Sequence, residues 1–284
     1  MISDRWHERF DAFAARKTRE ALDARLSPMV TVDGPDAAGF EAVGSRWSRR
    51  LFDGAFFLSR AGDATRPACS LVFVQSADGN TGSDDPGSLG GGATDKHLIY
   101  EGLSRVAADA VMAGAGTVRG AGVVFSVWHP EMVALRASLG CSRHPVQIVA
   151  TSRGLNPDEE LICNIPSTRV VLLTGEPPSS DLLKGLATRP WITRVAVDGG
   201  DFVAAFAHLR AMGIARISCV GGRSLARTLL AAGLVDDVLL TTAPHPGGEP
   251  NTPIAPWAWQ GRVVVRKHGT ENESNVLFEQ IVPR

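Results

Sequence analysis

The stretch that decides the fold is DAVMAGAGTVR, residues 109–119. Residues 110–113 form a short apolar run that is typical of a buried strand. The small residues Gly114-Ala115-Gly116 follow and let the backbone approach a ligand closely, while Thr117 adds a hydroxyl group and Arg119 a cation. The segment has the form of a phosphate-binding loop at the end of a strand. A tight turn without a ligand is the alternative interpretation.

Short apolar runs alternate with helical patterns from Pro67 to the end of the chain. This alternation predicts an α/β fold in three layers, with a mostly parallel central sheet and helices on both faces. We expect strands at 68–75, 110–113, 146–151, 169–173, 194–197, 216–220, 237–243 and 276–282, and helices at 95–107, 181–187, 202–212 and 224–232. Because no helix is expected between the last two strands, they should pair antiparallel at one edge.

The first 66 residues follow a different pattern. Trp6, Phe10 and Ala21 recur near helical spacing, and glycines interrupt the sequence further along. We expect residues 1–66 to form an N-terminal helical extension that packs on the main domain or on a partner subunit. Residues 67–284 should then form the domain that carries the functional site.

Composition excludes several classes of partner. The formal net charge is −1 at pH 7, with basic residues scattered along the chain, so we expect neither a nucleic-acid nor a membrane partner. No apolar stretch reaches the roughly 20 residues of a membrane span, and the N-terminus lacks the apolar region of a secretory signal. The four cysteines include no C-x-x-C, and the seven histidines have no ligand spacing. These features predict a cytoplasmic protein with no metal and a small-molecule substrate.

Two further segments follow strands, where ligands of open α/β sheets bind. Gln75 and Asp78 lie in QSADGN, residues 75–80, although Asp-Gly is also an ordinary turn dipeptide. Ser152 and Arg153 follow the strand at 146–151, and a hydroxyl beside a guanidinium suits an adenosine 2′-phosphate. An exposed turn is the alternative for this second segment.

The segment VGGRS, residues 220–224, joins a strand to a helix. The glycine pair Gly221-Gly222 permits unusual backbone angles, and the helix that begins at Arg223-Ser224-Leu225 presents free N–H groups to a pyrophosphate. A second glycine-rich run, residues 84–92, is too long for a simple connection, which predicts a mobile loop over the site or a disordered segment.

Several catalytic motifs are absent. The chain lacks the H-x-E and P-C-x-x-C motifs of zinc deaminases, the G-x-S-x-G elbow, H-E-x-x-H and the Walker A loop. The dinucleotide fingerprint G-x-G-x-x-G is also incomplete, because Arg119 occupies the position of its third glycine. An ordinary Rossmann dehydrogenase is therefore disfavoured.

Taken together, the segments resemble the reductase domain of bacterial riboflavin biosynthesis, the C-terminal domain of RibD, in the dihydrofolate-reductase-like superfamily. The resemblance runs from about Arg66 to Ile281 and rests on SADG at 76–79, DAVMAGAGTVR at 109–119, GGRSLA at 221–226, AGLVDD at 232–237 and AP at 243–244. It implies a mixed sheet flanked by helices, a homodimer, NADPH as hydride donor, and 5-amino-6-(5-phosphoribosylamino)uracil reductase activity.

The resemblance also implies roles for single residues. Gln75, Thr117, Ser152 and the segment 221–228 match positions that contact the dinucleotide, and Arg105 matches a substrate-binding arginine. Asp78 matches the acidic residue of the family's S-L-D-G motif and is the candidate proton donor.

The sequence departs from the family at the substrate end. Val220 stands where the family has Glu, and residues 120–125 lack the usual acidic pair. We therefore expect a conserved cofactor site and a substrate diverged to a related pyrimidine or pterin. A non-catalytic NADPH-binding protein of the same fold is the alternative. Trp257 and Trp259, two aromatic residues in a short segment, are predicted to be part of a homodimer interface, and the alternative is that both indoles cover the edge of the sheet.

Overall fold

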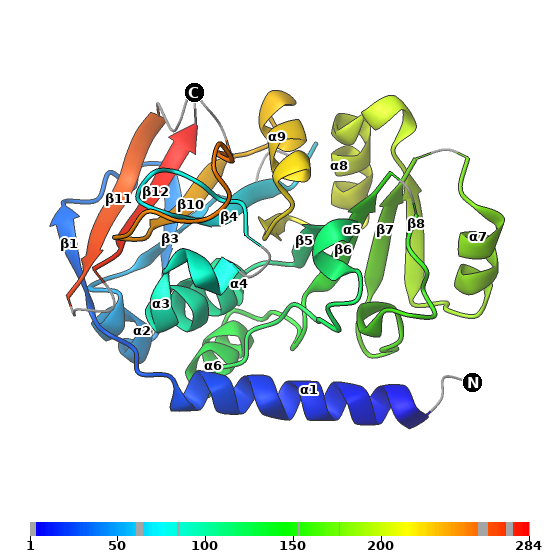
Figure 1. Cartoon of the computed structure of the whole chain (residues 1–284), viewed down its shortest axis with the longest axis horizontal. Helices are drawn as coiled ribbons and strands as arrows, with labels where there is room; N and C mark the ends of the chain where they lie inside the picture. The colour runs from blue at the N-terminus through cyan, green and yellow to red at the C-terminus, as the bar shows by residue number, and fades with distance from the viewer. Residues whose placement is uncertain are drawn as a thin grey trace.

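The centre of the fold is one sheet of ten strands. The computed structural model describes residues 4–60, 65–83, 86–152, 154–175, 177–254, 261–270 and 275–283. The strands lie in the order β1 (Met29–Asp33), β11 (Gly261–Gly269), β12 (Leu277–Pro283), β10 (Asp237–Thr242), β4 (Ala68–Gln75), β9 (Arg216–Cys219), β5 (Ala110–Gly114), β6 (Val146–Thr151), β7 (Val170–Thr174) and β8 (Ile192–Ala196). From β10 to β8 the strands are parallel, and β12, β11 and β1 extend the sheet antiparallel (Figure 1).

Helices cover both faces of this sheet, which confirms the predicted three layers. One face carries α2 (Arg46–Leu51), the continuous run α3 (Gly92–Thr94), η2 (Asp95–Leu103) and α4 (Ser104–Val106), then α6 (Pro130–Ser138) and α7 (Ser180–Ala187); the other carries α8 (Phe202–Ala211) and α9 (Arg223–Ala231) (Figure 1). Successive strand residues point to opposite faces. Val72 accordingly belongs to the same apolar cluster as Leu103, whereas Leu71 belongs to the cluster of Phe206.

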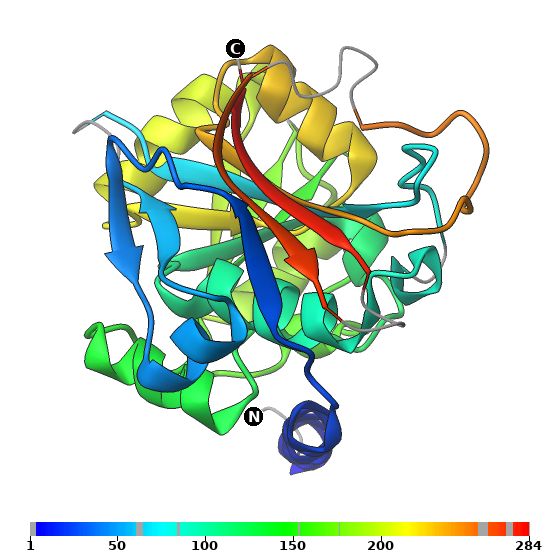
Figure 2. The ribbon, with the colours of Figure 1, turned by 90° about the vertical axis from the view of Figure 1, so that its left-hand side faces the viewer.

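The amino-terminal segment is more than a helix. It contains α1 (Asp4–Asp23), α2, the hairpin β2 (Phe40–Val43) and β3 (Phe56–Ser59), and β1, which pairs with β11 in the main sheet. Figure 2 shows α1 end-on below the body of the molecule and β1 beside β11. Phe13 of α1 packs edge-on against the buried Trp128 at 5.4 Å between ring centroids. The segment therefore packs on the main domain, one of the two expected arrangements.

Most of the predicted elements are present, and the main omission is β11. Strands at 68–75 and 146–151 have the predicted bounds, while β11 has the mixed sequence GRVVVRKHG. Its Lys267 is buried and donates to the Thr31 hydroxyl at 2.7 Å and to the Asp53 carbonyl at 3.0 Å. A lysine buried through hydrogen bonds to distant residues breaks the apolar alternation by which an edge strand is recognised.

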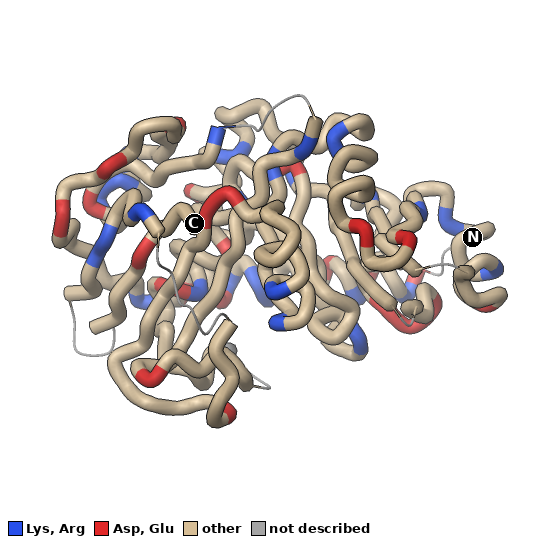
Figure 3. Tube along the Cα trace, turned by 90° about the horizontal axis from the view of Figure 1, so that it is seen from above, with Lys and Arg blue, Asp and Glu red and all other residues tan. Residues whose placement is uncertain are grey.

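The described part of the chain has interspersed charges and no long apolar helix. Figure 3 shows Lys and Arg interspersed with Asp and Glu along the trace, without one dominant charged face. None of the described helices is long and apolar enough to cross a membrane. Nor do the described residues contain a group of three His, Cys, Asp or Glu side chains that could hold a metal ion.

The short remaining helices complete the connections. They are α5 (Ala115–Val118), directly after β5, and the 3₁₀ turns η1 (Pro86–Leu89), η3 (Leu161–Cys163) and η4 (Asp198–Gly200). The turn η1 lies within the glycine-rich run 84–92 of the predicted loop over the site, although residues 84 and 85 are outside the described residues.

Candidate active site

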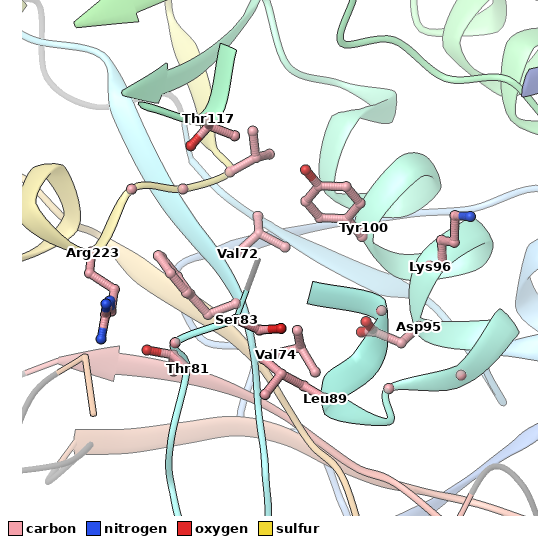
Figure 4. Close-up of a pocket in the computed structure, with 18 of the residues that line it drawn as sticks. Val72, Val74, Thr81, Ser83, Leu89, Asp95, Lys96, Tyr100, Thr117 and Arg223 are labelled. Atoms are coloured by element: carbon pink, nitrogen blue, oxygen red, sulfur yellow. The ribbon is translucent and has the colours of Figure 1, made fainter. Parts of the chain in front are cut away.

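A cavity of about 730 Å³ opens where β4, β9 and β5 end (Figure 4). In the sheet β9 lies between β4 and β5. The chain leaves β4 and β5 towards the face of η2 and α6, and it leaves β9 towards α9 on the opposite face. Crossovers that diverge in this way open a crevice at the carboxyl ends of the strands, which is the usual ligand site of an open α/β sheet.

One end of the cavity has the features of a dinucleotide cradle. Gly221 and Gly222 line it with φ values of 140° and 86°, a conformation that side chains rarely permit. Thr117 lines the same wall, and its Oγ1 lies 3.8 Å from where a Cβ on Gly221 would be. The two glycine loops are joined, because the Gly114 N–H donates to the Gly221 carbonyl at 3.1 Å. The predicted segments at 114–117 and 221–222 are therefore neighbours.

The helix α9 begins at this cradle. Gly222 is its N-cap residue and supplies no side-chain cap, and the first helical hydrogen bond runs from the Ala226 N–H to the Gly222 carbonyl. The N–H groups of Arg223, Ser224 and Leu225 precede that bond, which is the arrangement that binds phosphate oxygens at helix N-termini. The Arg223 side chain also lines the cavity and pairs with Glu249 at 3.1 Å.

A second hollow of about 660 Å³ lies beyond β6 and β7. Arg119 and Lys184 line it, together with Gly154 and Ser179, and Arg119 Nη2 donates to the Gly154 carbonyl at 2.7 Å. Asp158 and Asp181 line the same hollow, and Lys184 Nζ lies 3.5 Å from Asp181 Oδ1. Ser152 is exposed and does not line either hollow, Arg153 lies outside the described residues, and a Cβ on Gly116 would meet no atom within 4 Å.

The predicted residues at the end of β4 lie away from the cavity lining. Gln75 Nε2 donates to Thr242 Oγ1 at 3.0 Å. Asp78 is exposed in the following turn. Its carboxylate accepts hydrogen bonds from the Ser76 hydroxyl and the Gly247 N–H, and these bonds lower the pKa of Asp78. A carboxyl group that is already ionised at neutral pH is a poor proton donor.

The cavity contains a different acid, Asp95, which sequence reasoning missed. Its Oδ1 accepts a hydrogen bond from the Thr241 hydroxyl of β10, and Oδ2 lies against Gly91, where a Cβ would come within 2.7 Å. Val74 and Leu89 line the cavity beside it (Figure 4). Burial outweighs the Thr241 hydrogen bond and raises the pKa of Asp95 to about 6. The group therefore exchanges a proton near neutral pH.

The helix that carries Asp95 is a π-helix, not the α-helix predicted over 95–107. Its i→i+5 hydrogen bonds bring residues five apart onto one face. Tyr100 therefore follows Asp95 along the cavity wall, with its hydroxyl group directed towards the side of Thr117 (Figure 4). With the α-helical period of 3.6 residues, positions 95 and 100 do not share a face. This explains why the sequence pattern did not reveal the pair.

Arg105 does not line the cavity, unlike the substrate-binding arginine of the resemblance. It is 2% exposed, and its Nη1 donates to the Ser126 carbonyl at 3.1 Å. Its Cζ lies 4.3 Å from the Tyr100 ring centroid and 5.5 Å from that of Phe125. Tyr100 is therefore the member of this pair that lines the cavity.

A buried charged network connects the cavity wall to α1. His97 lines the cavity, its Nδ1 lies 3.0 Å from Glu101 Oε2, and Lys17 of α1 pairs with the other Glu101 oxygen. Burial by itself would raise the pKa of Glu101, but the His97 hydrogen bond and the charges of Lys17 and Arg105 prevail and lower it to about 2. Because Glu101 is a carboxylate that only accepts hydrogen bonds, His97 carries a proton on Nδ1.

Comparison with known proteins places the chain in a family. The model of the RibD C-terminal domain matches residues 67–273. The chain belongs to this family. A 2,5-diamino-6-ribosylamino-4(3H)-pyrimidinone 5′-phosphate reductase of Methanothermobacter thermautotrophicus is 25% identical over 179 residues, which cover 63% of this chain and 78% of that protein.

Solved structures share the fold of this RibD C-terminal domain. A pyrimidine reductase-like protein of Corynebacterium diphtheriae aligns with a TM-score of 0.63 and 23% identity over 77% of this chain and 92% of that one. The Thermotoga maritima diaminohydroxyphosphoribosylaminopyrimidine deaminase/5-amino-6-(5-phosphoribosylamino)uracil reductase aligns with a TM-score of 0.56 and 18% identity. That alignment covers 77% of this chain and 57% of the Thermotoga chain. At these identities the likeness concerns the fold.

Proposed function

We propose that this RibD C-terminal domain is an NADPH-dependent reductase of a ribosylaminopyrimidine phosphate. The observation that carries the proposal is that one cavity joins the Gly221–Gly222 cradle to Asp95 and Tyr100. A phosphate-binding end and a proton-exchanging end in the same crevice are what a nicotinamide-dependent reduction requires. Membership of the RibD C-terminal family and the pyrimidine reductase named among its relatives support this choice of substrate.

The residues present fit NADPH. The backbone at the positive-φ pair Gly221-Gly222 and the first turn of α9 would hold the pyrophosphate, with the Thr117 hydroxyl beside them. Arg119 and Lys184 supply the cations that a 2′-phosphate needs. When bound, the dinucleotide supplies the hydride.

The chain's own residues then position the substrate and supply the proton. The apolar side chains of Val72, Val74 and Leu89 limit water around the carboxyl group of Asp95. Its pKa of about 6 lets that group give a proton to the reduced nitrogen or oxygen and recover one from solvent. Binding energy from the phosphate end holds the reacting carbon in place.

The experiment that tests the proposal measures NADPH oxidation with two ring systems, the 2,5-diaminopyrimidinone and the 5-aminouracil ribosylamine phosphates. We expect NADPH consumption with at least one of them. Val220, apolar where the family has Glu, favours the alternative of a non-catalytic NADPH-binding protein. NADPH binding without consumption on either substrate would support that alternative.

We also propose that the protein is a cytoplasmic homodimer. Its four cysteines are all free, and Cys69, Cys163 and Cys219 are buried, which suits a reducing compartment. Val30 and Val32, 49% and 50% exposed, lie on the edge strand β1, and such an edge is commonly covered by another chain. Trp257 and Trp259 of the predicted interface lie outside the described residues.

A further inference from the structure

Tyr100 is the only tyrosine of the chain, and its ring separates the ligand cavity from a buried cation. On one side Tyr100 faces the cavity with Thr117 and Asp95 (Figure 4). On the other side lies the guanidinium of Arg105, 4.3 Å from the ring centroid. The Tyr100 phenol can therefore contact a ligand in the cavity. At the same time it interacts with the positive charge of Arg105, which the ligand does not touch.

The π-helix sets the spacing of the side chains in this arrangement. Asp95, Tyr100 and Arg105 are five residues apart, which is the hydrogen-bond period of a π-helix. The first two face the cavity, and the third lies one turn further along, buried where η2 gives way to α4. The spacing thus places the carboxyl group and the phenol on the cavity wall, with the cation behind the Tyr100 ring.

Arg105 makes one side-chain hydrogen bond among the described residues, and its charge also acts on the Glu101 carboxylate. Its Nη1 donates to the Ser126 carbonyl, and its Nε and Nη2 have no hydrogen-bond partner among the described residues. The cation is enclosed by the rings of Tyr100 and Phe125. In such a water-poor site its field acts strongly on the adjacent phenol. Burial raises the pKa of Tyr100 while Arg105 opposes that rise, so the phenol keeps its proton as a hydrogen-bond donor.

We propose that the Tyr100 hydroxyl group donates a hydrogen bond to the nitrogen or oxygen atom that gains negative charge during reduction, and that Arg105 is a positioning residue acting through the Tyr100 ring. The inference rests on the proposed function. NADPH, when bound, would supply the hydride for a new C–H bond at the substrate carbon and would leave as NADP⁺. The π bond of the C=N or C=O group breaks, and its electron pair moves to the heteroatom. Tyr100 stabilises that charge, and Asp95 delivers the proton, which water replaces.

The same step explains how this chain works without an acidic residue at position 220. Val220 is apolar and lines the wall formed by the glycine loop, so it gives the substrate no polar contact. Tyr100 lies on the helical wall and supplies a neutral donor instead. A preorganised donor of this kind acts mainly on the transition state, because the charge that it stabilises develops only there.

The test uses Tyr100→Phe, which removes the hydroxyl group and keeps the ring over Arg105. We expect kcat to fall by about 10²-fold, the usual loss for one transition-state donor. The NADPH dissociation constant and the melting temperature should stay at their wild-type values. A Tyr100→Phe enzyme with wild-type kcat would overturn the inference and leave the proposed function standing. A wild type that oxidises no NADPH with either pyrimidine substrate would overturn both.

The role of Arg105 is tested by a double-mutant cycle with kcat as the readout. Arg105→Met should lower kcat in the wild-type background and have little further effect once Tyr100 is Phe, because the two residues act as one unit. Arg105→Lys keeps the charge and should therefore lower kcat less than Arg105→Met does. If Arg105→Met does not fold, the cycle can be measured with Arg105→Lys instead. Additive effects of the two substitutions would overturn the positioning role.

Arg136 provides a matched control. It is equally buried, at 1% exposed, and donates to the carbonyls of Arg105, Val106 and Ala108. Arg136→Lys should lower the melting temperature without changing the effect of Tyr100→Phe on kcat. The single tyrosine also allows a direct reading with ¹³C-labelled tyrosine, whose one ring signal should move in Arg105→Met and stay in place in Arg136→Lys.

Discussion

The Gly114 N–H donates to the carbonyl oxygen of Gly221 at 3.1 Å, and this bond joins the two glycine loops that the chain places more than a hundred residues apart. It holds the end of β5 against the end of β9. A Cβ on Gly222 would lie 3.6 Å from the Gly114 Cα, at ordinary van der Waals contact, so the two loops lie directly side by side. The proposed pyrophosphate cradle therefore depends on both loops at once.

Gly222→Val should abolish NADPH binding while the protein stays folded. The φ of 86° at Gly222 is one that a β-branched residue resists, so the loop must change its path and withdraw the N–H groups of α9. Calorimetric titration with NADPH measures the loss. Gly213→Val is the matched control, because Gly213 has a φ of 88° in the turn before β9, outside the cavity lining. A Gly222→Val protein that binds NADPH normally would contradict the prediction.

Arg119→Ala should weaken NADPH binding by roughly tenfold to a hundredfold and change NADH binding little. Losing a charge-assisted contact with a 2′-phosphate costs about 1.5–3 kcal/mol. We choose Arg119 for this test because it lines the hollow beyond β6. The sequence predicts the same role for Arg153, but that residue lies outside the described residues. Dissociation constants for both cofactors measure the effect, with Arg210→Ala on α8 as control. Equal weakening of both cofactors would exclude a 2′-phosphate role.

The sequence indicated that the two glycine loops are neighbours, but it did not reveal the helical wall of the cavity, for a physical reason. Gly114, Thr117 and the Gly221–Gly222 pair lie in short loops directly after apolar strands, so local pattern and sheet topology suffice to bring them together. The positions of Asp95 and Tyr100 depend on a change of helical period from 3.6 residues to that of a π-helix. That change is set by tertiary packing and leaves no local signature.

The strands at the edge of the sheet were also difficult to predict from the sequence. The strands β10 and β12 were predicted and pair antiparallel as expected, but β11 and β1 extend the sheet beyond them. Lys267 is buried only because Thr31 and Asp53, more than two hundred residues earlier, accept its hydrogen bonds. A partner so distant in sequence cannot be read from the pattern around residue 267.

Asp95→Asn should remove the pH dependence of turnover near neutrality. In the wild type the protonated acid is the active form, so kcat should fall as pH rises through the Asp95 pKa of about 6. The variant should show a low and flat profile. Asp78→Asn is the competing variant: it should keep the wild-type profile, and a flat profile in Asp78→Asn alone would return the acid role to Asp78.

The Asp95 carboxyl group also makes the free energy of unfolding depend on pH. Because the folded-state pKa of Asp95 is raised, its contribution is present below the ordinary value of 3.8 and is lost as pH rises through about 6. Asp95→Asn cannot ionise, so relative to the wild type it should gain about 2–3 kcal/mol of unfolding free energy between pH 4 and pH 7. Urea unfolding at the two pH values measures the difference.

The homodimer predicts a solution mass of twice the chain mass of 30.1 kDa. Trp257→Ala with Trp259→Ala should convert it to a monomer if these side chains form the interface, since buried indoles often dominate association energy. Val30→Ser with Val32→Ser tests the β1 edge in the same way. Light scattering decides between the two surfaces. A wild-type mass near that of one chain would refute the dimer itself.

Lys17→Met should destabilise the protein by about 2–4 kcal/mol, since it leaves the Glu101 carboxylate buried without its closest cation. Lys17 and Glu101 have side-chain exposures of 12% and 8%, so solvent cannot replace the lost charge.

The low pKa of Glu101, about 2, means that its stabilising contribution is complete above the ordinary value of 4.5 and is lost as pH falls towards 2. In Lys17→Met the folded-state pKa of Glu101 should rise towards 4.5, so this acid-dependent loss should be smaller and should end at a higher pH. Arg16→Met is the matched control, because Arg16 is 61% exposed and pairs only with Glu20 among the described residues. Urea unfolding across pH 2–7 measures both effects, and equal stability of the two variants would show that α1 is not held by its ion pair with the cavity helix.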